Sequence, residues 1–176
     1  NSILDFGCGK GVMLFKCCIR GTKIHKGIDI SEEGIKAARE IQKVSAKDNF
    51  CFSAGGVEKL ETIDDESFDG AILSNIIDNL FPSDAIKVLA EVKRILRIGG
   101  KVLVKLNPFL TDNKIKEWNI KIIDKNLLDD GLYLWNQTTE EWSALFLKYF
   151  SIVEYNEIYY HEHDQYNRLF LLCNDK

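Results

Sequence analysis

A chain of 176 residues, 45% of them hydrophobic and 28% charged, is long enough for one domain with its own core, and this composition excludes a disordered or membrane-embedded chain. A formal net charge of −4 at pH 7 excludes broad electrostatic capture of nucleic acid. The five cysteines are an odd number without a Cys-x-x-Cys pair, which indicates neither a disulfide framework nor a zinc site. We therefore expect a cytoplasmic protein in a reducing compartment.

The first predicted element is a buried strand at residues 3–6, which meets three glycines at alternate positions within residues 7–11. Glycine lets the backbone turn sharply and lets a ligand approach main-chain atoms without a Cβ in between. Residues 12–20 have helical character and stop at Gly21, a residue that favours a left-handed cap. Because a helix start carries partial positive charge, the pattern predicts a strand–loop–helix site for a nucleotide.

A second strand and helix follow. Residues 23–30 alternate polar and apolar side chains and predict a strand that closes on Asp29. Ser31 is a good cap for the next helix, which has Glu32 and Glu33 in its first turn. A carboxylate at the end of the second strand can accept hydrogen bonds from both ribose hydroxyls of a nucleoside bound over the glycine turn. Asp29 is therefore a candidate ribose ligand; the alternative is an ordinary aspartate at a helix start.

The middle of the chain repeats this rhythm. Short strands are predicted at residues 50–52 and 68–74. Pro82 begins a strong amphipathic helix, and the glycines at 99–100 are expected to close it before a strand at residues 101–106. Strands that alternate with helices predict a parallel sheet covered on both faces.

Residues 107–137 break the rhythm with a charged and aromatic stretch. It is either a lid or substrate-recognition insertion, or a surface excursion anchored by its aromatic side chains. Thr138 and Glu141 then form the pattern of a capping box at the start of a helix. Residues 151–160 and 166–173 predict two strands joined by a short loop.

The glycine turn at residues 5–11, Asp-x-Gly-x-Gly-x-Gly, resembles the first motif of the class I S-adenosylmethionine-dependent methyltransferases. In a dinucleotide fingerprint the third glycine would stand one residue later, at Val12. Residues 66–75 are similar to the fourth strand of the family, and residues 91–101 to the helix and glycine pair that follow it, with Ile98 in place of the usual proline. Together and in this order, the three pieces are more specific than any one alone.

This resemblance implies an α/β class I methyltransferase fold, with a doubly wound, Rossmann-like, mostly parallel seven-stranded sheet and a terminal antiparallel hairpin. It implies a single methyltransferase domain over residues 1–176, with residues 107–137 as an inserted lid or substrate-recognition segment. Family members have a helical segment before the first strand, so we expect that the natural N-terminal segment is missing from this sequence. The implied cofactor is S-adenosyl-L-methionine.

The resemblance also implies how the cofactor is bound. The glycine turn holds the methionine portion, Asp29 holds the ribose, and Ile30 offers an apolar surface to the adenine. Gly56 stands where the family has an aspartate that accepts from the adenine amino group, so we expect a main-chain amide near Val57 to contact that edge. The expected cofactor-binding residues are Asp5, Gly7, Cys8, Gly9, Asp29, Ile30, Gly56, Val57, Ser74 and Asn75.

The sequence does not identify a catalytic base. Asp78 and His161 are candidates, although capping or solvent exposure explains such residues equally well. His161 and His163 share one loop, where histidines are commonly solvated, so we expect no metal site.

We expect methyl transfer from S-adenosylmethionine to an unidentified small-molecule acceptor, with no nucleic acid or membrane partner; the oligomeric state stays open. One alternative is a catalytically idle module that uses this fold to bind a partner. The other is an NAD(P)-dependent oxidoreductase, which shares the strand–turn–helix and the acidic residue but does not predict the later motifs.

Overall fold

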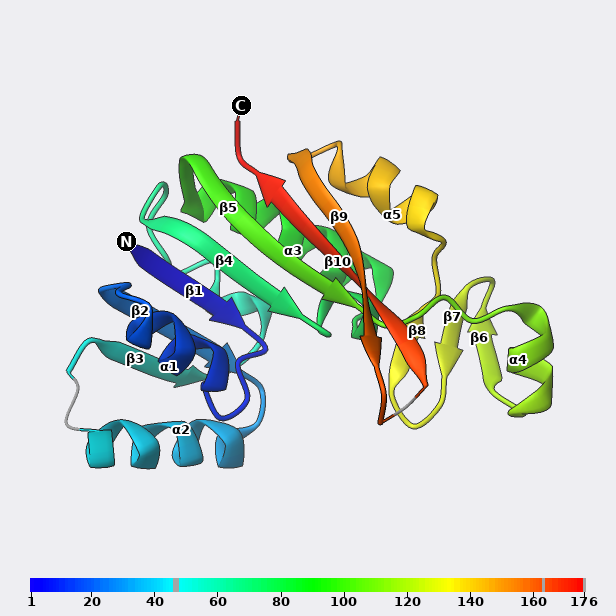
Figure 1. The fold of residues 1–176 in the computed structure, drawn as a ribbon, viewed down its shortest axis with the longest axis horizontal. Coiled ribbons are helices and arrows are strands. Elements are labelled where there is room, and N and C mark those ends of the chain that lie inside the picture. Colours follow the sequence, from blue (N-terminus) through cyan, green and yellow to red (C-terminus); the bar gives the residue numbers. More distant parts are fainter. Residues whose placement is uncertain (46–47, 163, 176) are drawn as a thin grey trace.

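The computed structural model describes residues 1–45, 48–162 and 164–175 (Figure 1). The strands are β1 (Ser2–Phe6), β2 (Ile24–Asp29), β3 (Phe50–Ala54), β4 (Phe68–Ser74), β5 (Leu96–Leu106), β6 (Lys121–Asp124), β7 (Leu127–Asp129), β8 (Tyr133–Trp135), β9 (Ser151–Tyr160) and β10 (Gln165–Cys173). The helices are α1 (Val12–Ile19), α2 (Glu32–Ser45), α3 (Pro82–Ile95), α4 (Asp112–Glu117) and α5 (Thr139–Phe146), and the 3₁₀ turns are η1 (Val57–Lys59) and η2 (Ile77–Asn79).

Over the described residues, the main sheet has seven strands in the order β3-β2-β1-β4-β5-β10-β9. Strands β1 to β5 are parallel, whereas β10 pairs antiparallel with both β5 and β9. The predicted doubly wound sheet with a terminal antiparallel hairpin is therefore confirmed. The chain moves outward from β1 to β2 and β3 and then returns to place β4 on the other side of β1. Ligands of open α/β sheets bind at the carboxyl ends of strands at such a switch point.

The alternation of side chains along the strands divides the core between the two faces of the sheet. Leu4 and Phe6 on β1 pack with the apolar faces of α3 and α5 in the larger cluster. Leu14 of α1 and Ile35 of α2 pack on the opposite face, in a smaller cluster with two phenylalanines of β3. Because both faces of the sheet are covered, the central strand β4 is buried along most of its length.

The expectation that the glycines at 99–100 close the long helix is wrong. Helix α3 ends at Ile95, and β5 starts at Leu96, whose backbone is extended (φ −80°, ψ 135°). Ser67 N donates to Ile95 O, and Arg97 reaches across to Asp69, so contacts with the start of β4 draw these residues into the sheet. The amphipathic pattern continues past the true helix end because Leu96 is buried and apolar as well, and the spacing of apolar residues does not reveal its extended backbone.

The stretch at residues 107–137 is built as a small unit of its own. It contains helix α4 and the antiparallel sheet β6-β7-β8, which the sequence did not predict. Ile115, Ile120 and Leu128 form its buried core. Figure 1 shows this inserted sheet beyond the carboxyl end of β5, next to the turn between β9 and β10. We refer to residues 107–137 as the insert.

The predicted capping box at the start of α5 is confirmed. The Thr138 hydroxyl accepts from Glu141 N at 3.2 Å, and the Glu141 carboxylate accepts from Thr138 N at 2.8 Å. None of the helices in the described part of the chain combines the length and apolarity that crossing a membrane requires.

Candidate functional site

The glycine turn between β1 and α1 adopts the backbone that only glycine accepts easily. Gly7, Gly9 and Gly11 have φ values of +81°, +51° and +75°. Gly7 N and Cys8 N both donate to Ile28 O on β2, which fastens the turn to the neighbouring strand. A Cβ at Gly11 would lie 2.8 Å from the ring of Phe52, whereas a Cβ at Gly9 would meet nothing within 4 Å. The turn is therefore packed below Gly11 and open above Gly9.

Asp29, at the end of β2, lies directly against this turn. One carboxylate oxygen accepts from Gly9 N at 2.7 Å, and the other accepts from Ser31 N at 2.8 Å. A carboxylate offers about four lone-pair positions, so both oxygens can still accept a hydroxyl each. Ile30 is next in the chain and is 83% exposed. The structure thus places a carboxylate and an exposed apolar side chain side by side at the edge of the glycine turn.

Asp5 is buried beneath the turn. Burial, and secondly the charge of Asp29, raise the pKa of Asp5 to about 7. Burial, followed by the charges of Asp5 and Asp29, raises the pKa of the Cys8 thiol to about 12, so the thiol is neutral and Cys8 packs as a small residue. Below pH 7 Asp5 is therefore mostly protonated, and a cationic group bound nearby would favour its ionised form.

The loop after β3 continues the same edge. Gly55 N donates to Asp29 O at 2.9 Å, which holds the loop against β2. Gly56 N donates to the Glu58 carboxylate at 2.9 Å, and a Cβ at Gly56 would lie 3.0 Å from the other Glu58 oxygen. The Glu58 carboxylate therefore lies where a short acidic side chain at position 56 would project. Val57 is partly buried at the start of η1.

The carboxyl end of β4 approaches the glycine turn from the other side. Asn75 has a left-handed backbone (φ +54°), and its N–H donates to Lys105 O at 2.8 Å. This bend brings the Ile76 side chain over the turn, because a Cβ at Gly7 would lie 3.0 Å from it. Ser74 is the last residue of β4 and is partly buried.

The two candidates for a catalytic base are placed differently. Asp78, in η2, is fully buried, and burial raises its pKa. Its carboxylate accepts from Asn107 N at 2.6 Å, so it is held inside the protein and does not face an open cavity. His161 lies exposed at the turn after β9. His163, which shares this loop in the sequence, lies outside the described residues.

A cavity of about 450 Å³ lies at the same edge of the sheet, between the insert and the turn that precedes β10. Most of its lining residues belong to the insert and more than half of them are apolar, while Asn79 and several charged side chains line it as well. The lining residues are Asn79, Asn107, Pro108, Leu110, Lys114, Trp118, Ile120, Leu128, Asp130, Leu132, Leu134, Asp164 and Gln165. This volume is in the range of cavities that hold small organic ligands.

All ten sequence-predicted site residues belong to the carboxyl ends of β1 to β4 or to the loops that follow them. The sequence analysis did not include Glu58 among the candidate site residues, although its position two residues after Gly56 was a usable signal. It did not predict the cavity either. It also missed Arg168, a buried cation in the middle of a predicted strand. A charged residue in an otherwise apolar run of the terminal hairpin was the available signal.

Comparison with known proteins identifies relatives of this chain. A family model described as a methyltransferase domain matches residues 1–146. The tRNA N(3)-methylcytidine methyltransferase trm140 of Schizosaccharomyces pombe is 25% identical over 163 residues, which cover 88% of this chain and 52% of the relative. The chain spans about half the length, or less, of the curated relatives it matches.

Solved structures share the fold. The PH0226 protein of Pyrococcus horikoshii has a TM-score of 0.75 at 25% identity, with 98% of this chain and 81% of that chain covered. A Burkholderia thailandensis 1,6-didemethyltoxoflavin-N1-methyltransferase, solved with 1,6-didemethyltoxoflavin and S-adenosylhomocysteine bound, has a TM-score of 0.78 at 16% identity, with 98% and 70% covered.

Proposed function

Because the chain belongs to the family of class I S-adenosylmethionine-dependent methyltransferase domains, we propose that it transfers a methyl group from S-adenosylmethionine to a small-molecule acceptor. The observation that supports a small molecule is the cavity of about 450 Å³ at the sheet edge that carries the glycine turn. The five cysteines are free thiols, which supports the cytoplasmic setting that we propose.

The residues at the switch point fit this cofactor. Open space above Gly9 leaves room for a ligand chain on the turn, and Ile30 presents an apolar surface to a ring. Asp29 has lone pairs left for two ribose hydroxyls. Asp5 lies beneath the turn, where the ammonium of an amino-acid tail would favour the ionised form of its buried carboxyl group.

The bound cofactor supplies a methyl group that its sulfonium makes electrophilic. The task of this chain is therefore alignment: it must hold donor and acceptor in line at close approach and keep water out. Asp29 and the glycine turn would hold the donor, and the insert and Asn79 would hold the acceptor. If the acceptor is a hydroxyl or an amine, a base must take its proton. Asp78 does not serve this step in the arrangement seen here, because both its oxygens are buried.

The charge of the insert favours a small acceptor over a nucleic acid. The relative from Schizosaccharomyces pombe is named for a tRNA substrate, which makes tRNA the second candidate acceptor. The insert carries four lysines against five acidic residues, so the walls of the cavity do not form the positive surface that phosphate binding needs.

The proposal is tested by thermal unfolding with S-adenosylhomocysteine and with NADH, followed by labelled methyl transfer to a panel of phenols, amines and unmodified tRNA. We expect S-adenosylhomocysteine alone to raise the melting temperature, and label to enter a small molecule. Stabilisation by NADH alone would favour an oxidoreductase. Binding of S-adenosylhomocysteine without transfer to any acceptor would favour an idle binding module, and label in tRNA would overturn the small-molecule acceptor.

We expect Asp29→Ala to weaken the binding of S-adenosylhomocysteine by about 1–3 kcal/mol, because two charge-assisted hydrogen bonds to the ribose are lost. Calorimetry measures the change. Asp29 also accepts from Gly9 N and Ser31 N, so Asp29→Asn, which keeps one acceptor oxygen, separates ribose binding from loop support. Glu32→Ala, an exposed acid in the next helix turn, is the matched control. Equal affinity in all four proteins would remove Asp29 from the site.

We further expect Glu58→Ala to weaken S-adenosylhomocysteine binding about three- to tenfold, because the Glu58 carboxylate lies where it can accept from the adenine amino group. The same substitution should leave the affinity for the analogue with a 6-oxo group in place of the amine unchanged. Glu61→Ala removes an exposed glutamate that pairs with Lys87 and serves as the control. An equal loss for both ligands would show that Glu58 supports the loop rather than contacting adenine.

A further inference from the structure

Both ends of the insert meet at one buried arginine. Arg168, on β10, donates from Nε to the carbonyl of Asn107 at 3.0 Å and from Nη1 to the carbonyl of Gln137 at 2.8 Å. These carbonyls belong to the first and the last residue of the insert, and Arg168 is only 3% exposed. One side chain of the main sheet thus closes the base of the inserted unit.

A buried carboxylate holds the same base from the opposite side. Asp78 accepts from the backbone N–H of Asn107 at 2.6 Å and from its side-chain Nδ2 at 3.0 Å. Asp78 is 0% exposed and comes from η2, just after β4. Asn107 therefore contacts a buried anion from η2 and a buried cation from β10. We call Asp78 and Arg168 the clamp.

Weaker ties extend from the clamp to the strands of the insert. Asn79, next to Asp78, donates to the carbonyl of Tyr133 on β8 at 2.8 Å and accepts from Asn107 Nδ2 at 3.2 Å. Within the insert, the Asn136 side chain bonds to both the N–H and the carbonyl of Leu110. The polar contacts are concentrated at the base of the unit, whereas its interior is apolar.

Holding the insert with two buried charged side chains costs free energy, because both groups are removed from water. Within the described residues, Oδ1 of Asp78 and Nη2 of Arg168 are buried without a hydrogen-bond partner. Burial raises the pKa of Asp78 and lowers that of Arg168, because in each case removal from water disfavours the charged form. Opposite charges buried in this way add little net stability compared with apolar residues. Their hydrogen bonds, however, fix the positions of Asn107 and Gln137 at the base of the insert. Asn107 lines the cavity together with Asn79, the residue that follows Asp78.

We propose that Asp78 and Arg168 are positioning residues that lock the insert onto the catalytic sheet and so set the affinity for the acceptor, independently of the cofactor. This inference rests on the proposed function for its identification of the cavity as the acceptor site. The mostly apolar walls, with Trp118 and Leu132 among them, suit a ring compound with few polar groups.

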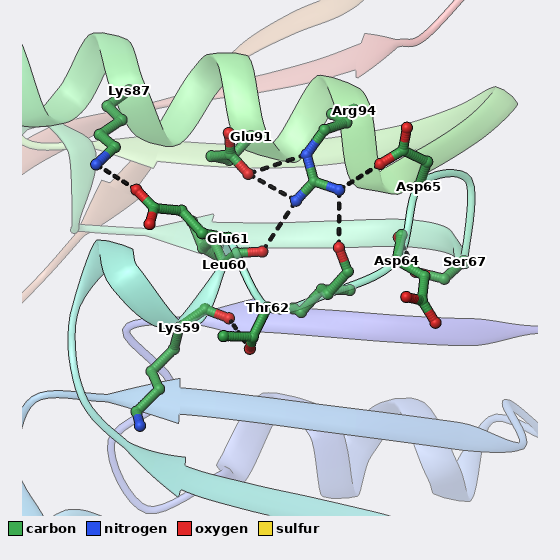
Figure 2. A network of polar contacts seen from close by, with 11 residues as sticks. Lys59, Leu60, Glu61, Thr62, Asp64, Asp65, Ser67, Lys87, Glu91 and Arg94 are labelled. Carbon is green, nitrogen blue, oxygen red and sulfur yellow. Dashed lines mark hydrogen bonds and ion pairs between the residues drawn. The ribbon is translucent and has the colours of Figure 1, made fainter.

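Arg94 offers a matched control elsewhere in the molecule (Figure 2). It extends from α3 and donates to the carbonyls of Leu60 at 3.0 Å and Ile63 at 2.7 Å, and it pairs with the carboxylates of Asp65 and Glu91. Like Arg168, it binds two carbonyls of one chain segment, but it joins that segment to α3 and not to the main sheet, and the segment lies before β4 and does not line the cavity.

The test compares wild type with Arg168→Met, Arg168→Lys, Asn79→Ala and Arg94→Met. Hydrogen–deuterium exchange is followed in peptides from residues 107–137 and 57–67, calorimetry gives the affinity for S-adenosylhomocysteine, and tryptophan fluorescence follows binding of 2-naphthol, a ring compound with one hydroxyl. We expect Arg168→Met to speed exchange in the insert about tenfold or more and to weaken 2-naphthol binding about tenfold, while S-adenosylhomocysteine affinity changes less than about twofold.

Arg168→Lys keeps the charge, so we expect slower exchange in the insert and tighter 2-naphthol binding than in Arg168→Met. A general loss of packing would not be reversed by the charge alone. Asn79→Ala removes the bonds to Tyr133 and to the Asn107 side chain and should speed exchange in the insert more weakly than Arg168→Met does. Because Asn79 also lines the cavity, its exchange data and not its 2-naphthol affinity decide the clamp if Arg168→Met fails to fold. Arg94→Met should speed exchange in residues 57–67 alone.

Exchange that rises equally throughout the chain in Arg168→Met, or no rise in the insert, would overturn the clamp. A wild type that does not bind 2-naphthol would overturn the assignment of the cavity to a ring-containing acceptor. A wild type that does not bind S-adenosylhomocysteine would overturn the proposed function, and the exchange data would still decide the clamp.

Discussion

Replacing Trp142 with alanine is expected to lower the free energy of unfolding by about 3–5 kcal/mol, because a fully buried indole is removed and its surroundings collapse only in part. Trp142 is 0% exposed. Its ring meets Trp135 edge-on at 5.0 Å between centroids and stacks on Phe146 at 5.5 Å, and Phe146 in turn meets Phe170. This aromatic column connects β8 of the insert, α5 and β10, so its loss is expected to loosen the insert as well.

Urea unfolding measures this change. Within the described residues Nε1 of Trp142 is buried without an acceptor, so its removal recovers a small part of the loss. Trp118→Ala is the control of equal size: Trp118 is 53% exposed, and its truncation should change stability by no more than about 0.5 kcal/mol. Similar losses in both variants would mean that the column is not the main apolar contact between the insert and the sheet.

The second large effect concerns the pH dependence of stability. The pKa of Asp5 is about 7 in the folded protein, against 3.8 when unfolded. Between these values the folded protein keeps a proton that the unfolded chain has released. The contribution of Asp5 is therefore complete below pH 4 and is lost as the pH rises towards 7, and a shift of about three pKa units corresponds to at most about 4 kcal/mol.

Asp5→Asn mimics the protonated side chain at every pH. We expect this variant to match wild type near pH 4 and to be more stable by about 2–4 kcal/mol at pH 8, measured by urea unfolding at both values. Asp78 also has a raised pKa, but it is present in both proteins and cancels in the comparison. Asp69→Asn should behave in the opposite sense, because bonds from Ser2 and Arg97 lower the pKa of Asp69. A constant difference between Asp5→Asn and wild type would show that Asp5 is not buried as a neutral acid.

Local pattern was enough to predict most of the main sheet. The glycine turn, Asp29 and the capping box at Thr138 all depend on contacts within a few residues or on the fixed polarity of a strand end, and the structure has all of them at the expected places. The end of α3 and the inner structure of the insert were not predicted. Leu96 and Ile98 continue the apolar spacing of α3, and the insert mixes charged and aromatic residues. In both cases only docking against the sheet decides whether the backbone coils or extends.

The sequence by itself determined the order of strands and helices of the main sheet, the glycine turn after its first strand and the acidic residue that ends its second strand, because periodicity and backbone preference are properties of neighbouring residues. Only the tertiary structure decided where Arg168 reaches, since Asn107 and Gln137 lie 61 and 31 residues away along the chain. It also decided that Asp78 is buried and not exposed to a cavity. The sequence around a charged residue does not identify a partner that is distant along the chain. The two groups come together only when the sheet, the hairpin and the insert pack against one another.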